Sequence, residues 1–140
     1  MSAWNASNRM APKLVLADGT FDPLHAGHVR YLLRAKRYGS CLMVRVAPDA
    51  DILAKGRHPF QTQAERMLVL CQLRCVDDVC TDETLEEAVR RCRPTYLVKG
   101  RDWHARLPVE VLLACQEIGT TIQFTNTRVR SSTARLAAMV

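Results

Sequence analysis

The chain has 140 residues, of which 48% are hydrophobic and 24% are charged, a balance typical of one globular domain with a core of its own. No apolar run approaches the roughly 20 residues that span a bilayer, and the polar start lacks a signal-peptide pattern, so we expect a cytoplasmic protein without a membrane partner. The net charge of +6 favours anionic ligands.

Short apolar segments alternate with amphipathic ones along the chain. The expected strands are Leu14–Ala17, Cys41–Ala47, Val76–Cys80, Thr95–Val98 and Thr120–Phe124. The expected helices are Ala26–Tyr38, Thr62–Arg74, Thr84–Cys92, Pro108–Ile118 and Ser131–Met139. Segment 49–61 contains Gly56 and Pro59 and is expected to be a loop with at most one helical turn. Residues 1–12 are expected to form a flexible lead-in to a single domain over residues 13–140.

Two finer expectations concern helix ends and helix faces. Gly39 and Gly119 are expected to cap the helices that precede them. Spacing near 3.6 residues predicts one buried face for the helix at 62–74, formed by Met67, Leu68, Leu70, Cys71 and Cys75. The six cysteines contain no C-x-x-C pair, so buried, reduced thiols are expected and no protein metal site.

Alternation of strands and helices with short connections predicts an α/β fold of the Rossmann-like, three-layer αβα type, with a five-stranded parallel sheet. In such an order the first and fourth strands are neighbours and the fifth lies beyond the fourth. Ligands of these sheets bind beyond the carboxyl ends of the strands. The turns after the first, fourth and fifth strands should therefore open onto one crevice.

The most informative motif follows the first strand and opens the first helix. Its residues combine a glycine turn with two imidazoles three positions apart: Gly19, Thr20, Phe21, Asp22, His25, Gly27 and His28. A helix start presents unpaired N–H groups and the positive end of the helix dipole, which suits phosphate. A glycine between the two histidines leaves room for a nucleotide against the helix start.

This H-x-G-H pattern resembles that of nucleotidylyltransferases of the cytidylyltransferase-like superfamily, and the resemblance extends from about Leu14 to Leu136. The nearest likeness is to the heptose 1-phosphate adenylyltransferase domain. It rests on segments 25–29 (H-A-G-H-V), 65–67 (E-R-M) and 98–100 (V-K-G). Glycerol-3-phosphate cytidylyltransferases carry an arginine associated with cytosine recognition where this chain has Asn126. This difference weakens the interpretation that CTP is the nucleotide substrate, but it does not establish ATP as that substrate.

The resemblance implies roles for particular residues. His25, His28, Lys55 and Arg66 would contact the phosphates of the reacting nucleotide. Further nucleotide contacts would come from Lys99, Gly100, Asp102 and Trp103 after the fourth strand, and from Arg130, Ser131, Ser132 and Thr133 before the last helix. Arg57 and His58 are interpreted as surface residues.

The implied reaction transfers a nucleoside monophosphate from ATP or CTP to a phosphorylated small molecule, with Mg²⁺ bound mainly through the nucleotide phosphates. The resemblance also implies a homodimer. Scattered basic residues and 6% aromatics argue against a nucleic-acid partner. Two alternatives stay open: a glycerol-3-phosphate or related alcohol-phosphate cytidylyltransferase, and a non-catalytic nucleotide-binding module.

Overall fold

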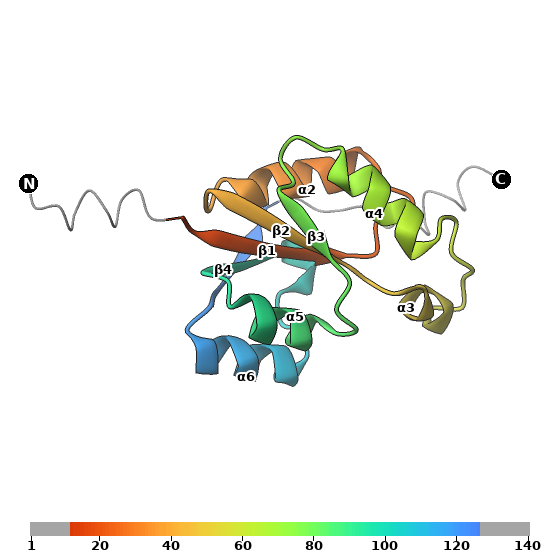
Figure 1. Cartoon of the computed structure of the whole chain (residues 1–140). Coiled ribbons are helices and arrows are strands. Elements are labelled where there is room, and N and C mark those ends of the chain that lie inside the picture. Colours follow the sequence, from red (N-terminus) through yellow and green to blue (C-terminus); the bar gives the residue numbers. More distant parts are fainter. Residues whose placement is uncertain (1–11, 127–140) are drawn as a thin grey trace, which may run out of the picture.

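The computed structural model describes residues 12–126. Its centre is a parallel sheet of β1 (Leu14–Gly19), β2 (Cys41–Val46), β3 (Asp78–Cys80), β4 (Tyr96–Gly100) and β5 (Thr121–Thr125), in the order β3-β2-β1-β4-β5 (Figure 1). Each neighbouring pair of strands is parallel. The expected sheet is confirmed, including the pairing of β1 with β4 and the position of β5 beyond it.

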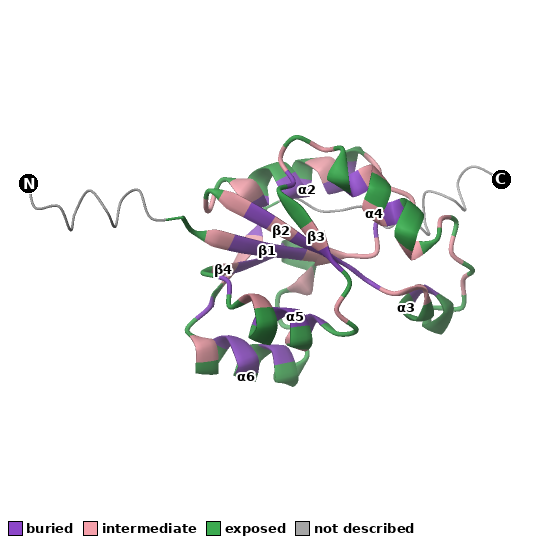
Figure 2. Ribbon diagram, viewed as in Figure 1, coloured by how far each residue is buried: buried purple, intermediate pink, exposed green. Residues whose placement is uncertain are grey.

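Helices cover both faces of this sheet. α2 (Ala26–Lys36) and α4 (Gln63–Cys71) lie on one face, and α5 (Leu85–Cys92) and α6 (Val109–Ile118) lie on the other (Figure 1). Successive side chains of β1 point to opposite faces of the sheet. Val15 belongs to the core under α2 and α4, and Leu16 belongs to the core under α5 and α6. Figure 2 shows the buried residues gathered along the sheet and the inner faces of these helices. The three-layer fold is therefore confirmed.

Two short elements lie at the carboxyl edge of the sheet. α3 (Asp49–Ala54) follows β2, and a 3₁₀ turn, η1 (Arg101–Trp103), follows β4. The six residues of α3 exceed the single turn expected in segment 49–61, because acidic residues at 49 and 51 favour a helix start there. No helix within residues 12–126 is long and apolar enough to cross a membrane. The expected helix at 131–139 and most of the expected lead-in lie outside the described residues.

The end of α2 differs from the expectation. The helix ends at Lys36, and its C-cap, Arg37, is right-handed rather than a left-handed glycine. Gly39 has a different purpose: a Cβ there would lie 2.4 Å from the carbonyl oxygen of Lys13, which accepts hydrogen bonds from the N–H groups of residues 40 and 41. Gly39 thus permits close backbone approach. Gly119, with φ of +88°, caps α6 as expected.

The buried face of α4 was predicted in part: Leu70 is in the core and Met67 and Cys75 pack against it, as expected. Arg66 and Leu70 are buried, whereas Leu68 is 64% exposed and Cys71 is exposed. The helix is rotated so that an arginine, which the hydrophobic pattern treated as polar and outward, points inward. Of the other cysteines, Cys80 and Cys115 are buried and the remaining three are half-buried.

Candidate functional site

A pocket of about 460 Å³ opens at the carboxyl ends of β1, β2 and β4, where the topology predicts a ligand. The structure brings together in its walls nine of the residues expected from the sequence: Gly19, Thr20, Phe21, His28, Lys55, Lys99, Gly100, Asp102 and Trp103. The same walls include Asp18, Tyr31, Arg45, Ala47, Asp51, Arg57 and Arg106. The segment 130–133 lies outside the described residues.

The two histidines form the start of α2 through their own side chains. His25 is the N-cap, and its Nδ1 accepts the backbone N–H of Gly27 at 3.1 Å. Nδ1 of His28 accepts the backbone N–H of His25, also at 3.1 Å. This is a capping box built from imidazoles. Because Nδ1 accepts in both rings, the proton of each neutral ring is on Nε2. The helix start therefore fixes both Nε2–H groups as donors.

Ring packing holds these imidazoles in place. The rings of His25 and His28 stack with centroids 3.8 Å apart, and Phe21 meets the His28 ring edge-on at 5.1 Å. Phe21 has a positive φ of 54°, which turns its ring back beneath the loop. A Cβ at Gly19 would lie 2.9 Å from that ring, so the glycine makes room for it. The G-T-F-D turn thus supports the His28 ring.

A buried ion network forms the floor of the pocket. Asp18, near the end of β1, accepts Nζ of Lys99 at 3.0 Å on one oxygen and Nη1 of Arg45 at 2.8 Å on the other. Burial, the largest influence, would raise the pKa of Asp18, but the charges and hydrogen bonds of Lys99 and Arg45 outweigh it and hold that pKa below its ordinary value of 3.8. Lys99 also lies 4.2 Å above the Trp103 ring. Lys99 is therefore fixed between a carboxylate and an indole.

The lowered pKa of Asp18 predicts an acid-dependent loss of stability. Ionised Asp18 stabilises the folded state fully above pH 3.8, and this contribution is lost as the pH falls through the depressed folded-state pKa. Asp18→Asn is expected to lower the free energy of unfolding at pH 7 by about 3–5 kcal/mol, because it leaves two buried cations without their counter-charge. Its stability should also depend less on pH below 3.8. Urea unfolding at several pH values measures both effects, with Asp78→Asn on the exposed start of β3 as control; parallel pH curves for Asp18→Asn and wild type would contradict this account.

Arg66 lies behind the pocket rather than in its wall. Its side chain is fully buried, and its guanidinium donates to the carbonyls of Thr20 and Ala47, each at 2.8 Å, and to that of Gln61 at 3.2 Å. It also pairs with Asp49 at 2.6 Å. These bonds join the turn after β1, the end of β2 and the loop before α4. The structure thus does not place Arg66 in the pocket wall, where a phosphate contact was expected; its hydrogen bonds position three segments around the pocket.

Asp22 also organises a loop rather than lining the pocket. Its carboxylate is fully buried and accepts the backbone N–H groups of Phe60 and Gln61, each at 2.8 Å. It also accepts Nη1 of Arg57 at 2.9 Å. Arg57 is consequently a largely buried, pocket-lining residue, and its interpretation as a surface residue was wrong. His58 is exposed, as expected.

Charge is unevenly neutralised around the pocket. Arg45 and Lys99 share Asp18, and Arg57 pairs with Asp22. Lys55 and Arg106, by contrast, make no ion pair within residues 12–126. Their charges lie at the mouth, since both side chains are exposed. The pocket is therefore suited to an anionic ligand that bridges the segment after α3 and the segment after η1.

Sequence reasoning did not single out seven of the lining residues for this pocket: Asp18, Tyr31, Arg45, Ala47, Asp51, Arg57 and Arg106. Arg45 carried a signal that could have been used. A lone arginine within the apolar strand C-L-M-V-R-V is stable only if it is paired. Asp51 and Arg106 carried no comparable signal.

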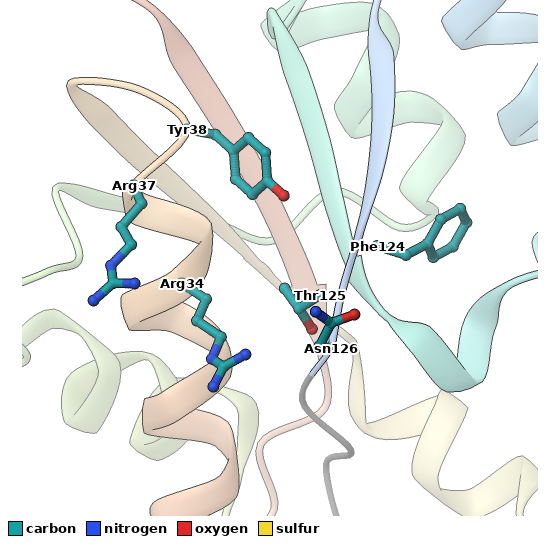
Figure 3. Close-up of a pocket in the computed structure, with 6 residues that line it drawn as sticks. All are labelled: Arg34, Arg37, Tyr38, Phe124, Thr125 and Asn126. Atoms are coloured by element: carbon teal, nitrogen blue, oxygen red, sulfur yellow. The ribbon is translucent and has the colours of Figure 1, made fainter.

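A smaller hollow of about 260 Å³ lies between α2 and the end of β5. Figure 3 shows Arg34 on α2 and Arg37 just after it, with Thr125 at the end of β5 and Asn126 beyond it across from them. The hollow shares no lining residue with the larger pocket, whose wall includes His28. The larger pocket is thus the candidate site.

Comparisons with known proteins agree with this assignment. A family model described as cytidylyltransferase-like matches residues 16–136. A D-beta-D-heptose 1-phosphate adenylyltransferase from Bordetella bronchiseptica is 35% identical over 94% of this chain and 84% of its own. The bifunctional protein HldE of Wolinella succinogenes is 42% identical over 74% of this chain; this match spans about a fifth of HldE, 22% of its length.

Solved structures show the same fold. The lipopolysaccharide core biosynthesis protein of Thermoplasma volcanium matches 84% of this chain and 99% of its own, at 26% identity and a TM-score of 0.72. The match of the family model to most of the chain, and the near full-length relative, establish the family. The chain belongs to the cytidylyltransferase-like family.

Proposed function

We propose that this protein is a nucleotidylyltransferase that transfers a nucleoside monophosphate from a nucleoside triphosphate to a sugar 1-phosphate of the heptose class. The nucleotide that we propose is ATP, so the transferred group is AMP. The observation that carries the proposal is the pair of imidazoles whose Nδ1 atoms are used for capping and whose Nε2–H groups are thereby fixed as donors at a helix start. The named activity of the Bordetella relative supports the choice of nucleotide and acceptor.

The reaction needs alignment more than acid–base chemistry. An oxygen of the acceptor's phosphate attacks the α-phosphorus and forms a new P–O bond. The bond between the α-phosphorus and the oxygen that bridges to the β-phosphate breaks, and its electron pair leaves with pyrophosphate. A phosphate monoester is ionised near neutral pH, so the attacking oxygen requires no general base. Catalysis then consists of positioning and of stabilising charge on the phosphoryl oxygens.

Residues of the pocket and of the adjoining start of α2 suit these tasks: His28 lines the pocket, and the His25 ring stacks on it. His25 and His28 donate from Nε2 to the α- and β-phosphate oxygens as negative charge develops. Lys55, unpaired within residues 12–126, supplies a cation for the departing pyrophosphate. Lys99 is held rigidly by Asp18 and Trp103, so it supplies fixed positive charge at the end of β4. Contacts of the nucleotide with Arg130 and with the hydroxyls of Ser131, Ser132 and Thr133 stay predictions.

Mg²⁺ is proposed to enter with the nucleotide. Within residues 12–126 no three His, Cys, Asp or Glu side chains are grouped to hold a metal ion, which suits an ion carried by the triphosphate oxygens and water. When bound, Mg²⁺ would neutralise part of the phosphate charge. The homodimer, the cytoplasmic location and the absence of a nucleic-acid partner also stay predictions.

Pyrophosphate release tests the function directly. ATP and CTP are each combined with a D-heptose 1-phosphate or glycerol 3-phosphate in the presence of Mg²⁺. We expect pyrophosphate with ATP and the heptose phosphate, in amounts equal to the nucleoside diphosphate sugar formed. Turnover with CTP and glycerol 3-phosphate would indicate the cytidylyltransferase alternative. Nucleotide binding without turnover with any phosphorylated acceptor would indicate a non-catalytic module and contradict the proposal.

A further inference from the structure

The pocket, which is otherwise suited to anions, is lined by three carboxylates, those of Asp18, Asp51 and Asp102. They differ in how closely cationic side chains pair with them. Both oxygens of Asp18 are used by Lys99 and Arg45. Asp51 is 48% exposed, and within residues 12–126 its one ion pair is a long contact of 3.8 Å with Arg45. Asp102 is exposed and has no ion pair within the same residues. Asp51 and Asp102 therefore keep free acceptor capacity inside the pocket.

These two carboxylates lie on different walls. Asp102 neighbours Trp103, whose indole is the kind of surface on which a nucleic-acid base stacks. Asp51 lies on α3, whose C-cap is Lys55, and Arg45 near the end of β2 lies 3.8 Å from its carboxylate. The lining residues from β2 to the loop after α3 include no aromatic side chain. The Asp51 wall therefore offers polar contacts without a stacking surface.

A free carboxylate in a phosphate pocket is best matched by a part of the ligand that carries no phosphate. It repels phosphate oxygens, but it is a strong acceptor for hydroxyl groups, whose O–H donates a charge-assisted hydrogen bond. Lys55, the C-cap residue of α3 four positions later, supplies the cation for the phosphates of the nucleotide. The pair Asp51 and Lys55 thus presents an acceptor and a cation one helical turn apart.

We propose that Asp51 binds hydroxyl groups of the phosphorylated acceptor and selects polyhydroxylated acceptors, such as sugar phosphates, over simpler phosphate monoesters. This assignment rests on the proposed nucleotidylyltransferase function. It places the acceptor on the α3 wall and the nucleoside on the η1 wall, with the phosphates between them at the start of α2. Asp51 is then a specificity-determining residue that contacts substrate, and the phosphate-bearing end of the acceptor points to His28.

The test combines Asp51 variants with altered acceptors. Wild type, Asp51→Ala and Asp51→Asn are assayed for pyrophosphate release with a D-heptose 1-phosphate and with its monodeoxy analogues, and ATP affinity is measured by calorimetry. Glu110→Ala, which removes an exposed carboxylate on α6 outside the pocket lining, is the matched control. We expect Asp51→Ala to raise the acceptor KM by about 10- to 100-fold, the size of a lost hydrogen bond to a charged group. The Kd for ATP should change by less than about twofold.

The deoxy analogues separate a direct contact from a structural effect. Removing the contacted hydroxyl should raise KM by about 10- to 100-fold in wild type and by no more than about threefold in Asp51→Ala, because the variant has already lost that bond. An unchanged or lowered acceptor KM in Asp51→Ala, or equal sensitivity of both proteins to every deoxy analogue, would overturn the assignment alone. Absence of wild-type turnover with every phosphorylated acceptor would overturn the proposed function, and this assignment with it.

Discussion

Replacement of His28 by alanine is expected to lower kcat by about 10²–10³-fold, the usual loss when one preorganised donor to a phosphoryl or oxyanion group is removed. The ring of His28 has two separable duties. Its Nδ1 accepts the backbone N–H of His25 and so completes the cap of α2, while its Nε2–H is the donor proposed to act on the nucleotide. Alanine removes both.

Two further variants of His28 separate the duties. Asparagine places an acceptor near the position of Nδ1 and has no atom at Nε2, so His28→Asn should keep the thermal stability of wild type and lose turnover. Glutamine can place an amide donor near Nε2 while weakening the cap, so His28→Gln should lose stability, by about 1 kcal/mol as for other caps, and keep more activity than the asparagine variant. Pyrophosphate release and thermal unfolding are measured for each. Near wild-type turnover in His28→Asn would contradict the role of the Nε2 donor.

Arg66→Ala is expected to lower the free energy of unfolding by about 3–5 kcal/mol, as much as Asp18→Asn, because it leaves three carbonyls and one carboxylate without a buried donor. Arg66→Lys retains the charge but reaches fewer of these acceptors, so its loss should be intermediate. Unfolding by urea, followed by circular dichroism, measures both.

Arg74, an exposed arginine shortly after α4, provides the control for Arg66. Arg74→Ala should leave stability unchanged within the error of the method. If Arg66 instead served mainly to bind the leaving pyrophosphate, Arg66→Ala would unfold like wild type and show only a lower kcat. That pattern would contradict the positioning role derived from its contacts.

The fold and the centre of the site could be predicted because their signals are local. Apolar segments of strand length, separated by amphipathic segments, are enough to predict the parallel sheet. The two histidines and the glycine turn before them are close in sequence, so the start of α2 could be recognised as a phosphate site without knowledge of tertiary contacts. The helix expected over Thr84–Cys92 is likewise confirmed as α5, with Thr84 as its N-cap.

The parts that were missed depend on contacts between distant segments. Arg66 points inward because carbonyls of residues 20 and 47 need a donor, and nothing within α4 itself reveals this. Gly39 is required because Lys13, 26 residues earlier, approaches it. Asp22 looked like a ligand residue of the H-x-G-H turn, but its partners lie nearly 40 residues later. Hydrophobic periodicity contains no information about such pairings.

The central claim is that the pocket at the start of α2, and not the hollow between α2 and β5, holds the triphosphate. A crystal structure of the protein with α,β-methylene ATP and Mg²⁺ measures this directly. The account predicts α- and β-phosphate oxygens within hydrogen-bond distance of Nε2 of His25 and of His28, with Lys99 within ion-pair or water-bridged reach of the nucleotide. A triphosphate bound beside Arg34 and Arg37, with both imidazoles free of it, would contradict the account.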